Sequence, residues 1–341
     1  MAQPSKGRPR ATRRERARGE HDVSIVDVAN RARVSLGTVS RVFNQHPNVA
    51  VDLRRRVLMA SRQLGFIPKV PHRCIGVVTG RTSTALPIGY VSVMSSLVSR
   101  ALAARKYAVE FIDIENLELA YQAHIEGVIG IVFDDRLLAL KEIPNLPLLT
   151  VNHPLMDKGV HSVRADHYAQ AQLATEHLLK QGHRSIGLLQ IQPDEWGSQQ
   201  RRQGFFDAMA KAGITVEPSH VQFTIEQPVY EVLSRWVNRG VTAILNFSED
   251  ASLEVLHFLS NILRLRIGHD ISMISLEDLP IYQYFTPPQT TVRQPLQALA
   301  EAAVTEMLRL CDATVDPTGE IVDLCLPSQL VERDSVATLT A

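Results

Sequence analysis

Apolar and polar positions between residues 24 and 64 follow the spacing of short helices. Apolar residues recur three and four positions apart over 25–32 and again over 36–43, and Ser24 and Ser35 stand directly before these runs. A serine in that position accepts free backbone N–H groups at a helix start. A third helix is expected in LRRRVLMASRQL, after a longer loop. The first two helices and their three-residue turn predict a helix-turn-helix, whose second helix lies in the major groove of DNA.

The exposed face of the second predicted helix carries residues that suit contact with bases. These are Leu36, Gly37, Ser40 and Arg41. Arginine is the side chain best suited to a bidentate contact with guanine, which discriminates against other bases by roughly 1–3 kcal/mol. The segment is therefore predicted to be a DNA-binding module. The alternative is a small helical bundle without affinity for DNA.

From residue 74 onward the pattern changes to short apolar runs separated by amphipathic helices. The runs are rich in Val and Ile and include CIGVVT, VEFIDI, GVIGIVF, LPLLTV, SIGLLQI, TAILNF and ISMISL. Such runs, separated by helices, predict buried parallel strands of an α/β fold. The intervening helices are expected at about 91–105, 168–181, 200–212, 228–239, 251–263 and 295–310.

Charge divides the chain into a basic head and an acidic body. The 341 residues suggest two or three domains, and their net charge is zero. Residues 1–73 hold 16 Lys and Arg against 5 Asp and Glu, or +11, which leaves 20 against 31, or −11, for the rest. This asymmetry predicts that only the head contacts nucleic acid, because the body repels phosphates.

Several classes of protein find no support in the sequence. Cys74, Cys311 and Cys325 lack metal-ligand spacing, and their odd number favours a reducing compartment over a disulfide framework. No apolar run could span a bilayer, and the basic N-terminus lacks the apolar segment of a secretion signal. No zinc-protease, nucleophile-elbow or phosphate-loop motif occurs. We therefore expect a cytoplasmic protein that is neither an enzyme nor a membrane protein and needs no metal or cofactor.

Residues 1–22 form a polar, Arg-rich segment without apolar periodicity, which predicts a disordered arm. Within it, Lys6-Gly7-Arg8-Pro9-Arg10 resembles the core of an AT-hook, whose arginines enter the narrow minor groove of A·T tracts. Arg8 and Arg10 are thus candidate DNA contacts. The alternative is a solvated tail that adds only nonspecific affinity for phosphates.

The run DVANRARVSLGTVSRVFN, followed by RRRVLMASRQLGFIP, resembles the DNA-binding domain of the lactose-repressor (LacI/GalR) family of bacterial transcription regulators. The distances from DVA to VS-x-x-TVSRV and on to the final LG-aromatic-x-P make the match specific. The resemblance implies base-reading positions at Leu36, Gly37 and Arg41, and phosphate-facing positions at Thr38, Ser40, Asn44 and Asn48.

The rest of the chain resembles the effector-binding core of the same family, which is similar to periplasmic sugar-binding proteins. The segments that carry this resemblance are GHRSIGLL (182–189), RRQGFFDAM (201–209), PPQTTVRQP (287–295) and LPSQLVERDS (326–335). It implies two doubly wound parallel α/β subdomains with a ligand in the cleft between them. The expected divisions are an arm (1–22), a helix-turn-helix domain (23–68), a linker (69–73) and a core (74–341), with subdomain 1 at about 74–163 and 290–318 and subdomain 2 at about 164–289 and 319–341.

The same resemblance implies an effector site at the ends of strands. Its expected members are Asn152, Trp196, Arg201, Ser248 and Glu277, the tryptophan as a stacking wall. Alternatively, Glu277 and Arg201 form an interdomain ion pair, and Trp196 is a partly buried loop residue. Ser248 stands where many members carry Asn and offers fewer hydrogen bonds. Either the ligand differs from those of familiar members or the cleft has lost it.

The link between head and core departs from the family. Only five residues separate Pro68 from the first strand of the core, and Pro71 lies among them. A proline there forbids an uninterrupted hinge helix, and no leucine is available to wedge into the minor groove. Arg33 stands where the family commonly has Gly, and Ala50 replaces a capping Ser or Thr.

Together these features predict a homodimeric transcription regulator, a repressor by expectation. Its partners would be a double-stranded DNA operator and a small-molecule effector, such as a sugar or related metabolite. The alternatives are a solute-binding receptor with a vestigial DNA-binding head, and a sugar-active enzyme on the same fold. The operator sequence and the identity of the effector stay open at this point.

Overall fold

The computed structural model describes residues 23–43, 49–66, 73–80, 89–122, 124–248, 251–312 and 320–339. Contacts divide the chain into two compact units, one holding the three helices before residue 71 and one holding both β-sheets. We call these units the head and the core.

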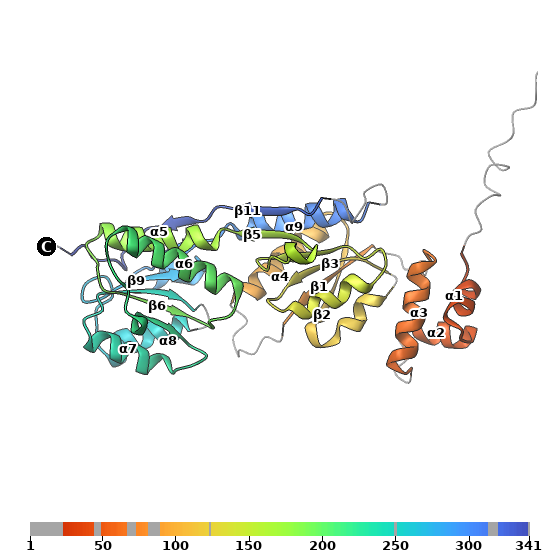
Figure 1. Cartoon of the computed structure of the whole chain (residues 1–341), viewed down its shortest axis with the longest axis horizontal. Coiled ribbons are helices and arrows are strands. Elements are labelled where there is room, and N and C mark those ends of the chain that lie inside the picture. Colours follow the sequence, from red (N-terminus) through yellow and green to blue (C-terminus); the bar gives the residue numbers. More distant parts are fainter. Residues whose placement is uncertain are drawn as a thin grey trace, which may run out of the picture. The chain divides into compact units, whose positions relative to one another are not determined.

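The described part of the head contains three short helices (Figure 1). They are α1 (Ile25–Ala32), α2 (Leu36–Phe43) and α3 (Val51–Gln63), as the apolar spacing predicts. Their buried faces carry Val28, Ala29, Ala32, Val39, Val42, Val57, Leu58 and Ala60. These mostly small side chains let the helices approach closely, which confirms the helix-turn-helix arrangement of α1 and α2.

The predicted caps are present at the first two helix starts. The Ser24 side chain accepts from the Asp27 backbone, and Asp27 Oδ2 accepts from the Ser24 backbone N–H at 2.8 Å, a complete capping box. The Thr38 backbone N–H donates to Ser35 Oγ at 3.1 Å. Ala50 gives α3 no side-chain cap, as its sequence predicts. The starts of α1 and α2 thus each follow from one local serine.

Arg33 ends α1 in the left-handed conformation, with φ 53° and ψ 51°. That conformation costs a residue with a Cβ roughly 1–2 kcal/mol relative to right-handed backbone. An arginine at this position, where the resemblance leads us to expect glycine, therefore lowers the stability of the fold.

The first sheet of the core is six-stranded and wholly parallel, in the order β11-β5-β4-β3-β1-β2. Its strands are β1 (Cys74–Thr79), β2 (Ala108–Asp113), β3 (Ile125–Ile131), β4 (Leu148–Val151), β5 (His161–Ala165) and β11 (Asp323–Leu326). Helices α4 (Tyr90–Ala104) and α9 (Leu296–Leu310) share one hydrophobic cluster with it. Helices bury a sheet face, and this explains why the central strands read as continuous apolar runs.

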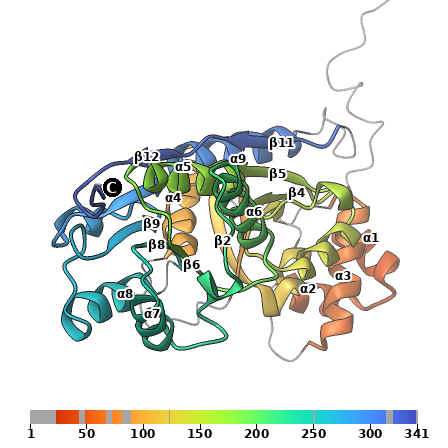
Figure 2. The same ribbon diagram turned by 60° about the vertical axis from the view of Figure 1, so that its left-hand side comes forward.

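The second sheet has the order β12-β10-β9-β8-β6-β7, with only the β10–β12 pair antiparallel. Its strands are β6 (Ile186–Gln190), β7 (Val221–Phe223), β8 (Ala243–Phe247), β9 (Ser272–Leu276), β10 (Thr290–Arg293) and β12 (Gln329–Val331). Helices α5 (His167–Lys180) and α6 (Trp196–Lys211) share one cluster with it, and α7 (Val229–Asn238) and α8 (Ser252–His257) share another (Figure 2). This confirms the predicted doubly wound α/β class.

Short irregular helices join these elements. They are η1 (Ile114–Tyr121), η2 (Asp135–Glu142), η3 (Met156–Lys158), η4 (Pro218–His220), η6 (Pro280–Tyr284) and the π-helical turn η5 (Phe258–Ile262). The helix expected at 251–263 is thus divided into α8 and η5. The helix expected to begin at residue 200 begins four residues earlier, at Trp196.

The chain crosses between the two sheets at points that differ from those expected. The sequence predicts β10 in the first subdomain and β11 in the second, but β10 pairs with β9 and β11 pairs with β5. The crossings therefore follow β5, β10 and β11 (Figure 1). Short crossing strands carry little periodicity of their own, so only strand pairing reveals which sheet each one joins.

Candidate functional site: a DNA-binding face and a cleft in the core

The exposed side of α2 presents the residues expected to read bases. Leu36 is 47% exposed although it is apolar. Gly37, Ser40 and Arg41 are exposed as well, while Val39 on the opposite face is fully buried. The geometry therefore frees one face of the helix for a partner, as the prediction requires.

The phosphate-facing candidates are only partly described. Thr38 is half-buried, and its hydroxyl lies 2.9 Å from Ser35 Oγ at the start of α2. Asn44 and Asn48 lie outside the described residues, as do Arg8 and Arg10 of the arm. Most of the predicted linker also lies outside them.

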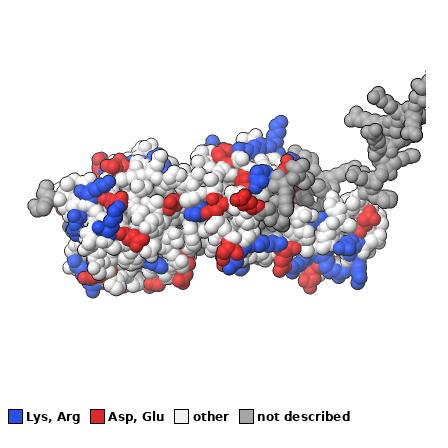
Figure 3. All heavy atoms as spheres, turned by 45° about the horizontal axis from the view of Figure 1, so that its top comes forward, with Lys and Arg blue, Asp and Glu red and all other residues white. Residues whose placement is uncertain are grey.

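The described part of the head is strongly basic. Its residues 23–43 and 49–66 hold seven arginines and two aspartates, or +5. Blue side chains are visible on this part of the surface (Figure 3). Because all seven cations are arginines, each offers a planar fork that matches phosphate oxygens or a guanine edge.

The core contains a small cavity between the carboxyl ends of strands from both sheets. Its volume is about 60 Å³. Three predicted effector residues line it, namely Asn152 after β4, Arg201 in α6 and Glu277 after β9. Carboxyl ends of strands are where ligands bind in open α/β sheets. The structure thus brings together residues that lie up to 125 positions apart in the sequence (277 − 152).

A chain of hydrogen bonds crosses this cavity. Asn152 Nδ2 donates to Tyr90 Oη at 3.0 Å and to Gln294 Oε1 at 2.7 Å. Gln294 Nε2 in turn donates to Glu277 Oε1. Gln294 lies directly after β10, in a segment that crosses between the sheets. This hydrogen-bond network therefore links the strand ends of both sheets through the side-chain amide of Gln294.

Two residues of this hydrogen-bond network have an unusual backbone conformation. Asn152 has φ 57° and Glu277 has φ 58°, both in the left-handed region. Asn visits that region at modest cost, but Glu does so rarely. Non-glycine residues with left-handed backbone cluster at ligand sites, where the surrounding structure holds them in this conformation. Their occurrence at corresponding strand ends in both sheets supports the assignment of the cleft as a binding site.

Arg201 is held by a buried histidine. Its Nη1 lies 2.5 Å from His167 Nδ1, and the two side chains are 6% and 3% exposed. Burial keeps the pKa of His167 well below its usual value, and the positive charges of Arg201 and Arg164 lower that pKa further. His167 is therefore neutral at physiological pH and accepts the Arg201 N–H, which orients the guanidinium in the cavity.

Trp196 and Ser248 do not line the described cavity. Trp196 is the first residue of α6 and packs edge-on against His167 at 5.3 Å between ring centroids. Arg164 lies over its ring at 5.4 Å. Ser248 is fully buried, and its Oγ lies 3.1 Å from Thr224 Oγ1. Trp196 is thus placed to support His167 rather than to form a wall of this cavity.

Several residues that line the cavity are absent from the effector site predicted from the sequence. These are Tyr90, Phe133, His167, Ile191, Glu195, Phe247, Leu276 and Gln294. A local signal existed for two of them. Gln294 belongs to the segment PPQTTVRQP, and His167 follows Asp166, which caps α5 through its bond from the Ala169 backbone N–H. Of the others, Glu195 looks like an ordinary surface charge in the sequence, and the rest are apolar or aromatic and resemble core residues.

Two stretches of the sequence match known families. Residues 24–69 match the bacterial regulatory proteins of the lacI family, and residues 175–336 match the periplasmic binding protein-like domain. The HTH-type transcriptional regulator GalR of Escherichia coli strain K12 is 29% identical over 338 residues, which cover 92% of this chain and 96% of GalR. The repressor PurR of Pasteurella multocida strain Pm70 is 25% identical, covering 83% and 90%.

Solved structures share the fold. The transcriptional regulator CelR in its complex with cellobiose superposes with a TM-score of 0.68 at 23% identity, covering 92% of this chain and 99% of CelR. The lac repressor dimer bound to operator and the anti-inducer ONPF gives 0.65 at 22% identity, with the same coverage.

A helix-turn-helix head joined to a two-sheet periplasmic-binding-protein-like core defines a class of transcription regulators. The chain thus carries a lacI-type DNA-binding domain at residues 24–69 and a periplasmic binding protein-like domain at residues 175–336, and it is similar to GalR over most of its length. Its DNA-binding domain and its curated relatives are those of transcription regulators, and the chain is accordingly a DNA-binding regulator rather than an enzyme. None of the helices in the described part of the chain is long and apolar enough to cross a membrane.

Proposed function

We propose that the protein is a cytoplasmic, homodimeric repressor that releases or engages an operator in response to a small hydroxylated effector, a sugar or related metabolite. The observation that carries the effector proposal is the hydrogen-bond chain Tyr90–Asn152–Gln294–Glu277 with Arg201 beside it. Several convergent amide, carboxylate and guanidinium groups in an otherwise apolar cleft suit a ligand rich in hydroxyls.

The size of the cavity implies that the effector opens the cleft. Ligand pockets usually measure about 300–1,000 Å³, whereas this one measures about 60 Å³. The side-chain amide of Gln294 occupies the route between Asn152 and Glu277. A ligand hydroxyl that replaces this amide would give both residues new partners and change how the crossing segment holds the two sheets. The effector signal would then start at the crossing segment.

DNA recognition would use α2, with Arg41 reading a guanine and Leu36 and Gly37 contacting neighbouring bases. Thr38, Ser40, Asn44 and Asn48 would approach phosphates, and Arg8 and Arg10 a minor groove. One helix-turn-helix reads only a few base pairs, so two heads on a two-fold axis are needed for useful specificity. Light scattering should show a dimer, and a stable monomer or tetramer would contradict this.

The experiment that tests the effector site compares wild type with Arg201→Ala. Fragments selected from the source genome supply an operator, and gel retardation then measures affinity with and without sugars that shift the melting temperature. Arg201→Ala should lose the effector response while its operator affinity without effector stays within about threefold of wild type, because the two sites lie in different units. An exposed control in α4, Arg100→Ala, should respond like wild type.

Two outcomes would reject parts of this proposal. If wild type and Arg201→Ala gained equal stability from the same sugar, the effector would bind elsewhere. If no genomic fragment were retarded, the protein would fit the alternative of a solute-binding receptor with a vestigial head.

A further inference from the structure

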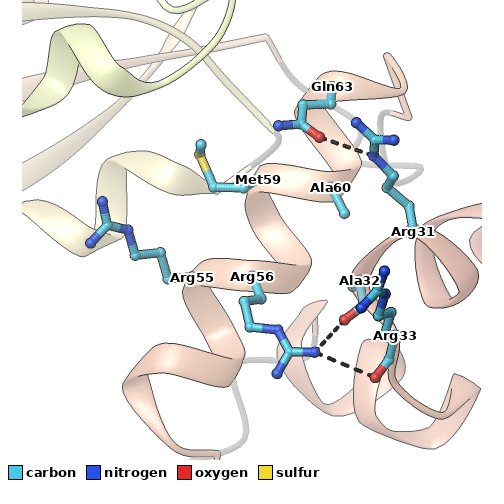
Figure 4. Close-up of a pocket in the computed structure, with 8 residues that line it drawn as sticks. All are labelled: Arg31, Ala32, Arg33, Arg55, Arg56, Met59, Ala60 and Gln63. Atoms are coloured by element: carbon cyan, nitrogen blue, oxygen red, sulfur yellow. Dashed lines mark hydrogen bonds between the residues drawn. The ribbon is translucent and has the colours of Figure 1, made fainter.

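A pocket lined by arginines lies in the head, away from the recognition helix. Its volume is about 570 Å³ (Figure 4). Arg31 and Arg33 reach it from the end of α1, and Arg55 and Arg56 reach it from α3. Met59, Ala60 and Gln63 complete the α3 side. We call this feature the arginine pocket.

Two of these arginines have structural contacts that hold the pocket in shape. Arg56 Nη2 donates to the Ala32 carbonyl at 2.7 Å and to the Arg33 carbonyl at 3.4 Å. It thereby satisfies acceptors at the carboxyl end of α1. Arg31 Nε donates to Gln63 Oε1 at 3.1 Å. These three hydrogen bonds connect α3 with α1 and its last residue, so the two walls of the pocket are tied together (Figure 4).

Arg33 has no comparable structural reason to be an arginine. Its left-handed backbone, φ 53°, would be less strained with glycine. Only its backbone carbonyl takes part in the bond from Arg56. The side chain therefore adds a positive charge to the pocket at the expense of backbone strain. Strain retained in this way is a mark of a functional position.

The composition of the pocket indicates what it can bind. The eight lining residues include four arginines and one glutamine but no carboxylate. The guanidinium of Arg55 also lies over the Tyr121 ring, 5.4 Å from its centroid. Guanidinium forks match the oxygens of phosphate in bidentate geometry. One phosphate ion is far smaller than this space, whereas a volume of about 570 Å³ lies within the range of small-molecule sites.

From these observations we propose that the arginine pocket is a second ligand site, for a small anion that carries two or more linked phosphates. No residue of α2 lines the pocket, so such an anion can bind while α2 contacts bases. Because the pocket joins α1 to α3, an occupant would brace the packing that supports the recognition helix. The head would then respond to a phosphate-rich metabolite independently of the cleft in the core.

The test uses the full-length protein in the absence of DNA. Inorganic pyrophosphate is the probe, and titration calorimetry measures its binding. Wild type should bind one pyrophosphate per chain. Arg33→Gly should weaken binding by about ten- to hundredfold, the loss of one charge-assisted hydrogen-bonding group. Arg54→Gln removes the same charge from α3 but lies outside the pocket, so it should weaken binding less than about threefold, through long-range attraction alone.

Hydrogen exchange on the same proteins separates a binding role from a structural one. The amides of α1 and α3 in Arg33→Gly should be as protected as in wild type or more so, because glycine relieves the backbone. Lower protection would show that Arg33 supports the fold, and the proposal would be wrong.

Three further results would overturn the proposal. Absence of saturable pyrophosphate binding, or equal weakening in Arg33→Gly and Arg54→Gln, would reduce the pocket to nonspecific charge. If Arg33→Gly left pyrophosphate binding unchanged but weakened binding to duplex DNA of unrelated sequence more than Arg54→Gln does, the pocket would be a contact for the DNA backbone instead.

Discussion

Replacing Asn152 by alanine should be the most informative perturbation of the cleft. The side chain is 1% exposed and makes three hydrogen bonds. Two are the bonds to Tyr90 and Gln294, and in the third the Ala165 backbone N–H donates to Asn152 Oδ1 at 2.7 Å. Alanine would leave these groups without their partner in a buried site and would adopt the left-handed backbone less readily than Asn.

The expected loss of stability follows from these contacts. A buried group left without its hydrogen-bond partner costs about 1–3 kcal/mol, and alanine in left-handed backbone adds about 1 kcal/mol. Tyr90 can turn its hydroxyl and water can enter the space, so the total should be about 3–5 kcal/mol rather than the full sum. Urea unfolding followed by the fluorescence of Trp196 and Trp236, both in the second subdomain, would measure it.

A matched variant separates the two contributions. Asn152→Gly loses the same hydrogen bonds but suits left-handed backbone, so it should be about 1 kcal/mol more stable than Asn152→Ala. A loss below about 1 kcal/mol for Asn152→Ala would refute the claim that this network holds the two sheets together. Equal stability of the two variants would refute the argument from backbone strain.

Three further outcomes are expected. Arg41→Ala should weaken binding to the operator by roughly 1–3 kcal/mol and flatten preference at one base pair; a uniform loss on all sequences would make Arg41 a phosphate contact. Deleting residues 1–20, which hold seven Lys and Arg, should reduce the salt dependence of binding and harm sites with A·T flanks most. Equal harm on G·C flanks, or strong bending of circularly permuted fragments, would contradict the minor-groove role of the arm and the expected absence of a wedge. Because burial lowers the pKa of His167 in the folded protein, unfolding takes up a proton below the ordinary pKa of about 6.5. Stability should therefore fall as the pH drops from 7 to 5, and His167→Gln should show a smaller fall in urea unfolding; identical slopes would mean that His167 is accessible to protons in the fold.

The sequence predicts the structure of the head more completely than that of the core. In the head, Ser24 and Ser35 mark helix starts, and the spacing of Val28, Val39 and Val42 marks the buried faces. Each signal is local, since a cap or a helical period involves neighbours within one or two turns. The recognition helix and its exposed face could therefore be predicted to within a residue.

In the core, the sequence by itself determined the α/β class, the long buried strands, the positions of Asn152 and Glu277 directly after strands, and the place of Arg201 in the helix that follows β6. These features can be predicted because apolar runs and family motifs depend only on the order of residues along the sequence. The sheet membership of β10 and β11 was decided only by pairing between strands that lie far apart in the sequence.

Only the tertiary structure placed Gln294 between Asn152 and Glu277 and His167 against Arg201. The same holds for the arginine pocket, whose members come from α1 and α3 and look in the sequence like scattered surface charge. Local patterns specify which segments form helices and strands and which faces are apolar. Which polar side chains meet depends on long-range packing, because a side chain finds its partner only after the elements that carry it have come together.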